Sequence, residues 1–266
     1  MKLAPLATLI CLLFLGTPLV GCFDAAPVRE PSDAEEVTVT VVRDGDTVNL
    51  SDGRRVRYLG INTPEYGQPY FEEAKEANRR LVEGQTVRME LDTQPTDRFG
   101  RTLAHLWVDG KHVNLELVSQ GLATAYHEAP NFRYRDAIHA AEQQARRDGA
   151  GLWKPSSAPV GIRSVVYDAP GADHENPNGE WVELINEGSA AIDLRGFTLK
   201  DEANHIYTFP STILESGQVM TIRSGQGQDR KGVLYWGLRG DAVWNNKGDT
   251  AYLRDPVGRL VDLFSY

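Results

Sequence analysis

A proline-rich segment, Pro-Ser-Ser-Ala-Pro at residues 155–159, divides the chain into two parts of similar length. The flanking parts, residues 37–154 and 160–266, are each long enough to fold as one compact domain with its own core. The first part mixes strand-like and helical patterns, whereas the second contains strand-like runs throughout. We therefore predict an α+β domain, a linker at 155–159, and an all-β domain.

The first 21 residues have the pattern of an export signal. Lys2 precedes an almost uninterrupted apolar run, residues 3–20, which two prolines and a glycine interrupt. This pattern indicates a signal peptide rather than a membrane span. The run ends in Leu-Val-Gly-Cys at residues 19–22, which resembles a bacterial lipobox, where the cysteine is acylated and becomes the mature terminus. An ordinary signal peptide with an incidental cysteine is the alternative.

Cysteine usage favours the lipobox. The chain contains only Cys11 and Cys22, so removal of the signal leaves Cys22 alone at the mature N-terminus. No intramolecular disulfide is then possible in the exported protein. Acyl chains on Cys22 would hold the protein durably on a membrane. We expect an exported, extracytoplasmic lipoprotein attached to the cell membrane or envelope.

Residues 22–36 have the composition of a tether. They are rich in acidic residues, alanine and proline and offer little apolar surface to bury, which predicts a disordered, extended leash. The whole chain has a net charge of −9, which excludes a protein that coats nucleic acid electrostatically. An enzyme that grips one phosphate through local arginines and a divalent cation does not need a positive global charge. The acidity favours transient contact with a substrate.

Five strands and three helices are predicted in residues 37–154. Alternating apolar residues, Asp-Gly turns and glycines after the helical runs set their limits. The predicted strands cover residues 37–41, 47–50, 55–61, 87–91 and 103–108, and the predicted helices cover 69–82, 112–120 and 132–147. Five strands with an intervening helix are typical of an OB-fold barrel.

Five short segments in this part carry residues suited to one chemistry. They are Arg-Asp-Gly-Asp-Thr at 43–47, Arg57, Asn-Thr-Pro-Glu at 62–65, Asp-Arg-Phe-Gly-Arg at 97–101, and Gly-Leu-Ala-Thr-Ala-Tyr at 121–126. Acidic oxygens near a turn can hold a hard cation, a further carboxylate can activate water, and two arginines can grip a phosphate. Singly, each segment reads more simply as a hairpin turn or a solvated surface arginine. Together they suit phosphodiester hydrolysis.

In this order and at these spacings, the segments resemble the catalytic framework of the staphylococcal-nuclease-like (thermonuclease) family. The resemblance covers nearly all of residues 37–153 and extends to the closing Gly-Leu-Trp-Lys at 151–154. It implies a five-stranded OB-fold barrel with helices and a Ca²⁺ cofactor. It also implies hydrolysis of DNA, with RNA as a second substrate, to leave 3′-phosphate ends.

The resemblance assigns roles residue by residue. Asp46 and the backbone carbonyl of Thr63 match calcium ligands of the family. Glu65 matches the carboxylate that positions or deprotonates the attacking water. Arg57 and Arg101 match the two arginines that bind the scissile phosphate, for which their planar, permanently charged guanidinium groups are well suited.

Two further positions have open interpretations. Tyr126 resembles the tyrosine that packs against the substrate base or phosphate, and packing in the core is an equal alternative. Asn62 stands where the family places a metal-binding aspartate. An amide oxygen can coordinate calcium, but without a full negative charge it should bind the cation more weakly. Asp44 and Asp97 lie beside these groups in sequence and could orient them.

Residues 160–266 consist of short strand-like runs separated by turn residues, which is typical of a β-sandwich. Three segments, at 179–184, 194–199 and 243–249, resemble the lamin-tail domain, which has an immunoglobulin-like fold. This part contains no catalytic constellation. It is therefore expected to bind or position an envelope polymer, a protein or a nucleic acid, and the resemblance does not choose among them.

Three hypotheses follow for the whole chain. The leading one is a lipid-anchored, calcium-dependent nuclease that acts as a monomer on extracellular nucleic acid. The second is a catalytically weakened lipoprotein that binds nucleic acid. The third is an envelope adhesion or scaffold protein in which the lamin-tail domain is primary.

Overall fold

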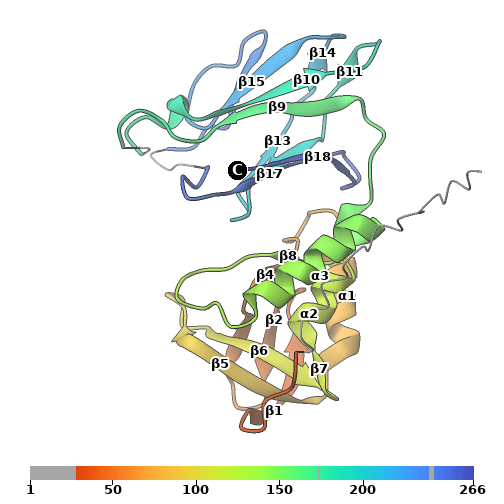
Figure 1. Ribbon diagram of the computed structural model, residues 1–266, viewed down its shortest axis with the longest axis vertical. Coiled ribbons are helices and arrows are strands. Elements are labelled where there is room, and N and C mark those ends of the chain that lie inside the picture. Colours follow the sequence, from red (N-terminus) through yellow and green to blue (C-terminus); the bar gives the residue numbers. More distant parts are fainter. Residues whose placement is uncertain (1–27, 173, 240–242) are drawn as a thin grey trace, which may run out of the picture.

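The computed structural model describes residues 28–172, 174–239 and 243–266. Two domains lie one above the other along the long axis of the molecule, joined by the chain that follows α3 (Arg135–Asp148) (Figure 1). The predicted signal peptide, Cys22 and the first part of the predicted tether, residues 22–27, lie outside the described residues.

The first domain contains the predicted five-stranded barrel. Its sheet has the order β3-β2-β1-β5-β6-β7, and a parallel pairing of β3 with β6 closes it. The strands are β1 (Glu35–Val42), β2 (Thr47–Leu50), β3 (Arg55–Tyr58), β5 (Thr86–Thr96), β6 (Thr102–Val108) and β7 (Lys111–His112). A separate short pair, β4 (Ile61–Asn62) with β8 (Thr124–Ala125), lies at the end of the barrel nearer the second domain (Figure 1). The OB-fold prediction is confirmed.

β1 departs from the alternation that its valines predict. Val37 and Val39 are buried as expected, but Val41 is 41% exposed and Val42 is buried instead. The pairing of β1 with β2 shifts register between Val39 and Val41. An irregularity of this kind inserts a residue into one strand and reverses the faces that follow it. Sequence alternation alone could not show it.

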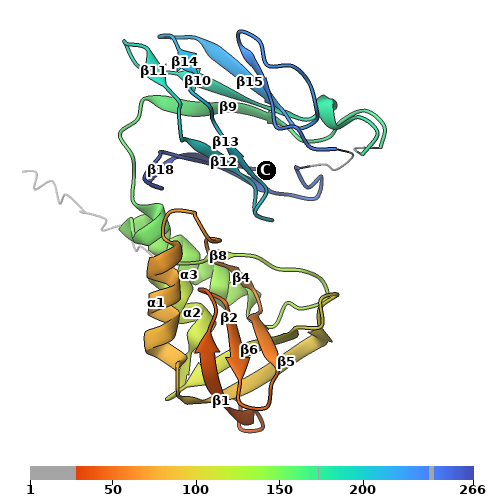
Figure 2. The same cartoon turned by 180° about the vertical axis from the view of Figure 1, so that it is seen from behind.

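Three helices cover the barrel: α1 (Phe71–Val82), α2 (Val113–Ser119) and α3. Figure 2 shows α1 beside β1 and β2, and α2 contacts both β6 and α3. The helix predicted from residue 112 begins one residue later, because the His112 side chain caps it by accepting a hydrogen bond from the Leu115 backbone N–H at 3.1 Å. α3 begins three residues later than predicted, after Tyr134.

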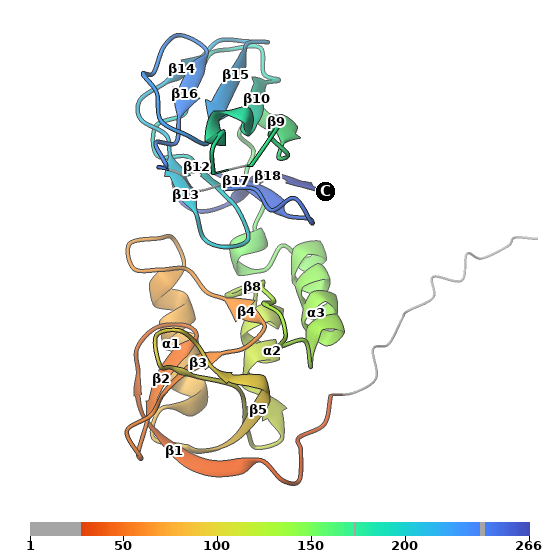
Figure 3. The ribbon, with the colours of Figure 1, turned by 90° about the vertical axis from the view of Figure 1, so that its left-hand side faces the viewer.

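The second domain is the predicted sandwich of two four-stranded sheets. One sheet has the order β16-β15-β10-β9, with β9 (Val160–Val166), β10 (Trp181–Asn186), β15 (Val219–Arg223) and β16 (Val233–Tyr235). The other has the order β13-β12-β17-β18, with β12 (Thr198–Lys200), β13 (Ile206–Thr208), β17 (Thr250–Arg254) and β18 (Leu260–Ser265). A two-stranded pair, β11 (Ile192–Asp193) with β14 (Ile213–Leu214), completes it. The sheet that contains β12 and β17 faces the first domain (Figure 3).

The two domains share a packed contact. Ala145 and Trp153 of the first domain form one buried cluster with Tyr252 of β17. The buried Arg254 guanidinium donates to the backbone carbonyl of Leu152 and lies over the Trp153 ring, with 5.5 Å from Cζ to the ring centroid. A buried guanidinium bound to the other domain's backbone holds the domains in one arrangement, because leaving this charge unpaired would be costly.

The predicted linker, residues 155–159, takes part in this contact. The Ser156 backbone N–H donates to the Leu260 carbonyl at 2.7 Å, and the Ser156 hydroxyl donates to Asp255 Oδ2 at 2.9 Å. The Leu260 backbone N–H donates in turn to the Lys154 carbonyl at 2.9 Å. These bonds attach the segment to the second domain.

Candidate active site

Asp46 lies at the turn between β1 and β2, where it is held from several directions. Its Oδ2 accepts hydrogen bonds from the Thr63 backbone N–H at 2.8 Å and from the Thr63 hydroxyl at 3.0 Å. Gly45 permits this approach, because a Cβ built there would lie 2.7 Å from the Thr63 side chain. The Asp-Gly-Asp turn therefore brings the segment at 43–47 against the segment at 62–65, as the proposed calcium site requires.

Arg57 connects this turn to the cavity. Its side chain leaves β3 with Nε 3.3 Å from Asp46 Oδ1. Its two terminal nitrogens donate to the Tyr58 carbonyl and to Asn62 Oδ1. Because Arg57 is anchored at three points, its guanidinium is oriented before any substrate binds.

Arg101 is placed by the turn that precedes β6. Asp97 Oδ1 accepts from the backbone N–H groups of Phe99 and Arg101, both at 2.9 Å, and Asp97 Oδ2 accepts from Arg101 Nε at 2.6 Å. Burial acts to raise the pKa of Asp97, but the hydrogen bonds from Arg101 and Phe99 outweigh it and hold the pKa below its usual value. Asp97 therefore stays ionised and orients Arg101, as its position in the sequence suggested.

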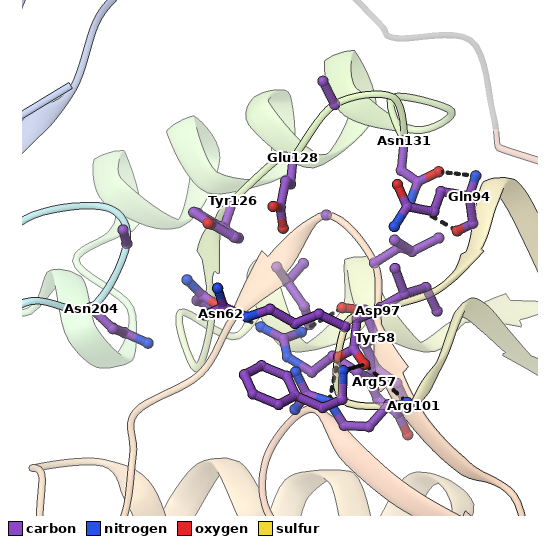
Figure 4. A pocket seen from close by; sticks show the side chains of 18 of the residues that line it. Arg57, Tyr58, Asn62, Gln94, Asp97, Arg101, Tyr126, Glu128, Asn131 and Asn204 are labelled. Carbon is purple, nitrogen blue, oxygen red and sulfur yellow. Dashed lines mark hydrogen bonds and ion pairs between the residues drawn. The ribbon is translucent and has the colours of Figure 1, made fainter. Parts of the chain in front are cut away.

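A cavity of about 490 Å³ lies between the two arginines and the facing loops. Figure 4 shows Arg57 and Arg101 on one side of it and Tyr126 on the other. The predicted residues that line this cavity are Arg57, Asn62, Glu65, Arg101 and Tyr126. Asp46 and Thr63 do not line it and lie behind Arg57. The structure thus brings the predicted residues to one place.

Glu65 is exposed at this cavity. Its backbone N–H donates to Gln68 Oε1 at 3.0 Å, and its carboxylate makes no hydrogen bond or ion pair with the residues that the structure describes. A carboxylate that is free of protein partners can accept a hydrogen bond from water. This is the property that the predicted base requires.

Tyr126 is half-buried and lines the cavity. Its position is therefore compatible both with packing in the core and with contact to a substrate. Its backbone N–H donates to the Gly60 carbonyl at 2.9 Å, which fixes the segment that follows β8. Burial raises the pKa of its hydroxyl, which therefore remains protonated at neutral pH and can donate a hydrogen bond into the cavity.

The oxygen donors beside Arg57 fit a hard cation such as calcium. The Asp46 carboxylate, the Asn62 amide oxygen and the Thr63 backbone carbonyl are all of the kind that calcium prefers. Burial and then the charge of Asp46 raise the pKa of the neighbouring Asp44 to about 6. Within the described ranges, no group of three or more His, Cys, Asp or Glu side chains is placed to hold a metal.

Asn62 has a partner that the sequence did not indicate. Its Nδ2 donates to the backbone carbonyl of Glu202, in the second domain, at 3.1 Å. Ala203 and Asn204 from the same turn line the cavity. No motif marked these residues, because the strands that flank them match an ordinary sandwich and the contact depends on how the domains pack.

Family models match both halves of the chain. Residues 55–155 match the family model of the staphylococcal nuclease homologue. The chain is 38% identical over 133 residues to the thermonuclease of Staphylococcus hyicus, a match that covers 46% of this chain and 79% of that protein. The chain belongs to the staphylococcal nuclease homologue family.

Other matches agree with this family. The chain is 36% identical over 129 residues to the thermonuclease of Staphylococcus intermedius, covering 45% of this chain and 77% of that protein. It is 39% identical over 133 residues to endonuclease YncB of Bacillus subtilis, a match that covers 45% of this chain and 63% of that protein. Residues 154–266 match the family model of the Lamin Tail Domain, so the predicted order of the two domains is confirmed.

Proposed function

We propose that this staphylococcal nuclease homologue is a calcium-dependent phosphodiesterase that hydrolyses DNA, and RNA as a second substrate, to 3′-phosphate ends. The observation that supports it most is the meeting of Arg57, Arg101 and Glu65 at one cavity, with Asp46 directly behind Arg57. The similarity to two thermonucleases and an endonuclease supports the same activity.

Each residue has a distinct part in the proposed reaction. Arg57 and Arg101 bind the phosphoryl oxygens of the scissile phosphate and stabilise the negative charge that grows on them. Glu65 accepts the proton of the attacking water, so that the water oxygen bonds to phosphorus as the bond to the 5′-oxygen of the leaving strand breaks. Calcium, when bound, would supply positive charge beside that phosphate. Asp46, Asn62 and the Thr63 carbonyl would hold it.

We also propose that the enzyme works outside the cytoplasm while held to a membrane through Cys22. The signal-like residues 1–21 and the lipobox-like residues 19–22 support this placement. In residues 28–172, 174–239 and 243–266, no helix has the length and apolar character needed to cross a membrane.

Calcium removal is the direct test of this activity. The full chain should hydrolyse a 5′-labelled oligonucleotide in calcium, and excess EGTA should reduce the rate to background, with restoration when calcium is returned. The products should be poor polymerase primers until a phosphatase removes their 3′-phosphates. Hydrolysis that is unaffected by EGTA, or products that are extended directly, would contradict the proposal.

Asn62→Asp tests the metal assignment. A carboxylate adds a full negative charge to the donor set, so the calcium concentration for half-maximal rate should fall severalfold. Asp46→Asn should shift the same midpoint in the opposite direction. Asn62→Asp also removes the hydrogen bond that Asn62 Nδ2 donates to the Glu202 carbonyl. The melting temperature of this variant should therefore decrease by a few degrees. An unchanged calcium midpoint would show that residue 62 does not ligate the metal.

A further inference from the structure

A second hollow lies beside the candidate active site, on the surface of the barrel. It has a volume of about 610 Å³ and lies between the β2–β3 hairpin, with Arg54 and Arg55, and the turn before β6, with Phe99 and Arg101. We name it the hairpin groove. Phe99 and Arg101 also line the first cavity. The two hollows therefore meet at these two residues, and a chain-like ligand can pass from one into the other.

Strand pairing places Arg55 next to the two arginines of the candidate active site. On β3, Arg55 and Arg57 flank the buried Val56, so their side chains leave the strand on its outer face, about 7 Å apart along it. β3 pairs in parallel with β6, and Val56 stands opposite Thr102. Arg55 is therefore beside Arg101, which immediately precedes Thr102. The three arginines form one continuous cationic surface.

Arg55 is the arginine of this groove whose charge is not used by the protein. Its neighbour Arg54 donates to Asp52 Oδ2 through Nε at 2.8 Å and to Glu35 Oε2 through Nη1 at 3.0 Å. Arg55 is exposed, and its guanidinium makes no hydrogen bond or ion pair with the residues that the structure describes. An anion from solution can therefore bind it without displacing a carboxylate of the protein.

Phe99 gives the groove an exposed aromatic wall. The residue is 69% exposed, in a turn that Asp97 holds by accepting a hydrogen bond from the Phe99 backbone N–H at 2.9 Å. Cζ of Arg98 lies 4.8 Å from the ring centroid, and Cζ of Arg101 lies 5.6 Å from it. An accessible aromatic ring with positive charges beside it is how proteins bind single-stranded nucleic acid, because bases stack on the ring while the charges contact the backbone.

The two features together identify the class of ligand. A free phosphate would use Arg55 but not the aromatic ring, whereas a nucleotide within a strand uses both. A base in a duplex is already stacked on both sides, so a base on Phe99 has to come from a single strand. The volume of the groove, about 610 Å³, is in the range that holds one unit of this size.

We propose that the hairpin groove is a second nucleotide subsite for single-stranded nucleic acid. Arg55 binds the phosphate next to the scissile phosphate, and Phe99 stacks on the base of that nucleotide. This inference rests on the proposed nuclease function, since it takes the strand to continue from the phosphate held by Arg57 and Arg101. A substrate then needs two phosphodiesters to reach its full affinity.

The salt dependence of binding tests the contact with Arg55. A fluorescein-labelled oligothymidylate is titrated with the full chain in EGTA over a range of NaCl concentrations, and anisotropy gives the Kd. Arg55→Gln should make the slope of log Kd against log salt shallower by about 0.7, the value for one phosphate of a single strand. Because the contact is exposed, Kd at moderate salt should rise only about 2- to 5-fold. Arg55→Lys keeps the charge and should keep the slope.

Arg195→Gln is the matched control, because it removes the same charge elsewhere. Arg195 is 72% exposed and makes one loose ion pair with Asp193 at 3.7 Å. It follows β11, at the end of the second domain away from the barrel (Figure 1). Its Kd and salt slope should equal those of the wild type.

Strand length and the aromatic ring give two independent readouts. Unlabelled dithymidylate and trithymidylate compete with the labelled probe, and they carry one and two phosphodiesters. Arg55→Gln should leave the Kd of the dinucleotide unchanged and raise that of the trinucleotide. Phe99→Leu keeps an apolar side chain but removes the stacking surface, so the Kd of the trinucleotide should rise about 5-fold or more, with the salt slope unchanged.

A wild-type salt slope for Arg55→Gln would overturn the inference, as would an equal change of slope in Arg195→Gln, which would indicate only the general charge of the protein. A wild type that binds no oligothymidylate would overturn it too, and wild-type affinity of Phe99→Leu would refute the stacking. Failure of the nuclease proposal would appear elsewhere, as a lack of calcium-dependent hydrolysis, which these titrations in EGTA do not require.

Discussion

Arg101→Lys should lower kcat/KM by about 100-fold or more, although it preserves the positive charge. Arg101 Nε donates to Asp97, which leaves the rest of the planar guanidinium to contact two phosphoryl oxygens at once. A lysine is a single point charge and cannot bond Asp97 and bridge those oxygens together. Removal of one preorganised donor costs about 3 kcal/mol in other hydrolases, which corresponds to this loss. Steady-state kinetics on a single-stranded oligonucleotide measure it.

The matched control for this substitution is Arg80→Lys on α1. Arg80 is 65% exposed and makes one loose ion pair with Glu76 at 3.7 Å. The kcat/KM of Arg80→Lys should equal that of the wild type. Arg80→Lys and Arg101→Lys should both have melting temperatures close to that of the wild type. If Arg101→Lys retained nearly full activity, charge alone would suffice and bidentate binding of the phosphate would be refuted.

The barrel and most of its site could be predicted from the sequence because both depend on local patterns. Alternating valines and Asp-Gly turns are signals carried by neighbouring residues, and they located the start of each barrel strand to within two positions. The ends were less accurate, because β5 continues to Thr96, beyond its predicted end at residue 91, and the strand predicted at 55–61 is divided into β3 and β4. The Asp-Gly-Asp turn and the Asn-Thr-Pro-Glu segment meet because Gly45 allows Thr63 to approach Asp46. The family resemblance indicated this convergence, and the structure shows the contact that produces it.

The remaining features depend on contacts between distant residues. The register shift in β1 arises from its pairing with β2, so the exposure of Val41 was not apparent. The approach of Glu202 to Asn62 spans 140 residues and arises only when the two domains pack. The sequence therefore predicted only one role for Asn62, that of a weakened metal ligand, and gave no sign of its hydrogen bond to the second domain.

Glu65→Gln should reduce kcat by about 10²- to 10⁴-fold, the usual contribution of a general base. The amide has the shape of the carboxylate but cannot take a proton from water at neutral pH. Glu65 is exposed, and its carboxylate has no bonded partner in the described part of the chain, so the fold should be unaffected. The loss should therefore appear in kcat, while the Kd for an oligonucleotide in EGTA stays within about twofold of the wild type. Glu65→Asp keeps the base but shortens it, and its rate should be intermediate.

Glu128 is the competing carboxylate, because it lines the same cavity from the segment that follows Tyr126. Glu65 lies two residues after Thr63, in the segment whose Asn62 and Thr63 bond Arg57 and Asp46, so it lies on the side of the phosphate-binding arginine. Glu128 has no such connection to the residues that the structure describes, and it faces the cavity from the opposite loop. Glu128→Gln should thus change kcat far less than Glu65→Gln does. The reverse order of effects would move the base to Glu128, while the phosphate contacts of Arg57 and Arg101 would stay as proposed.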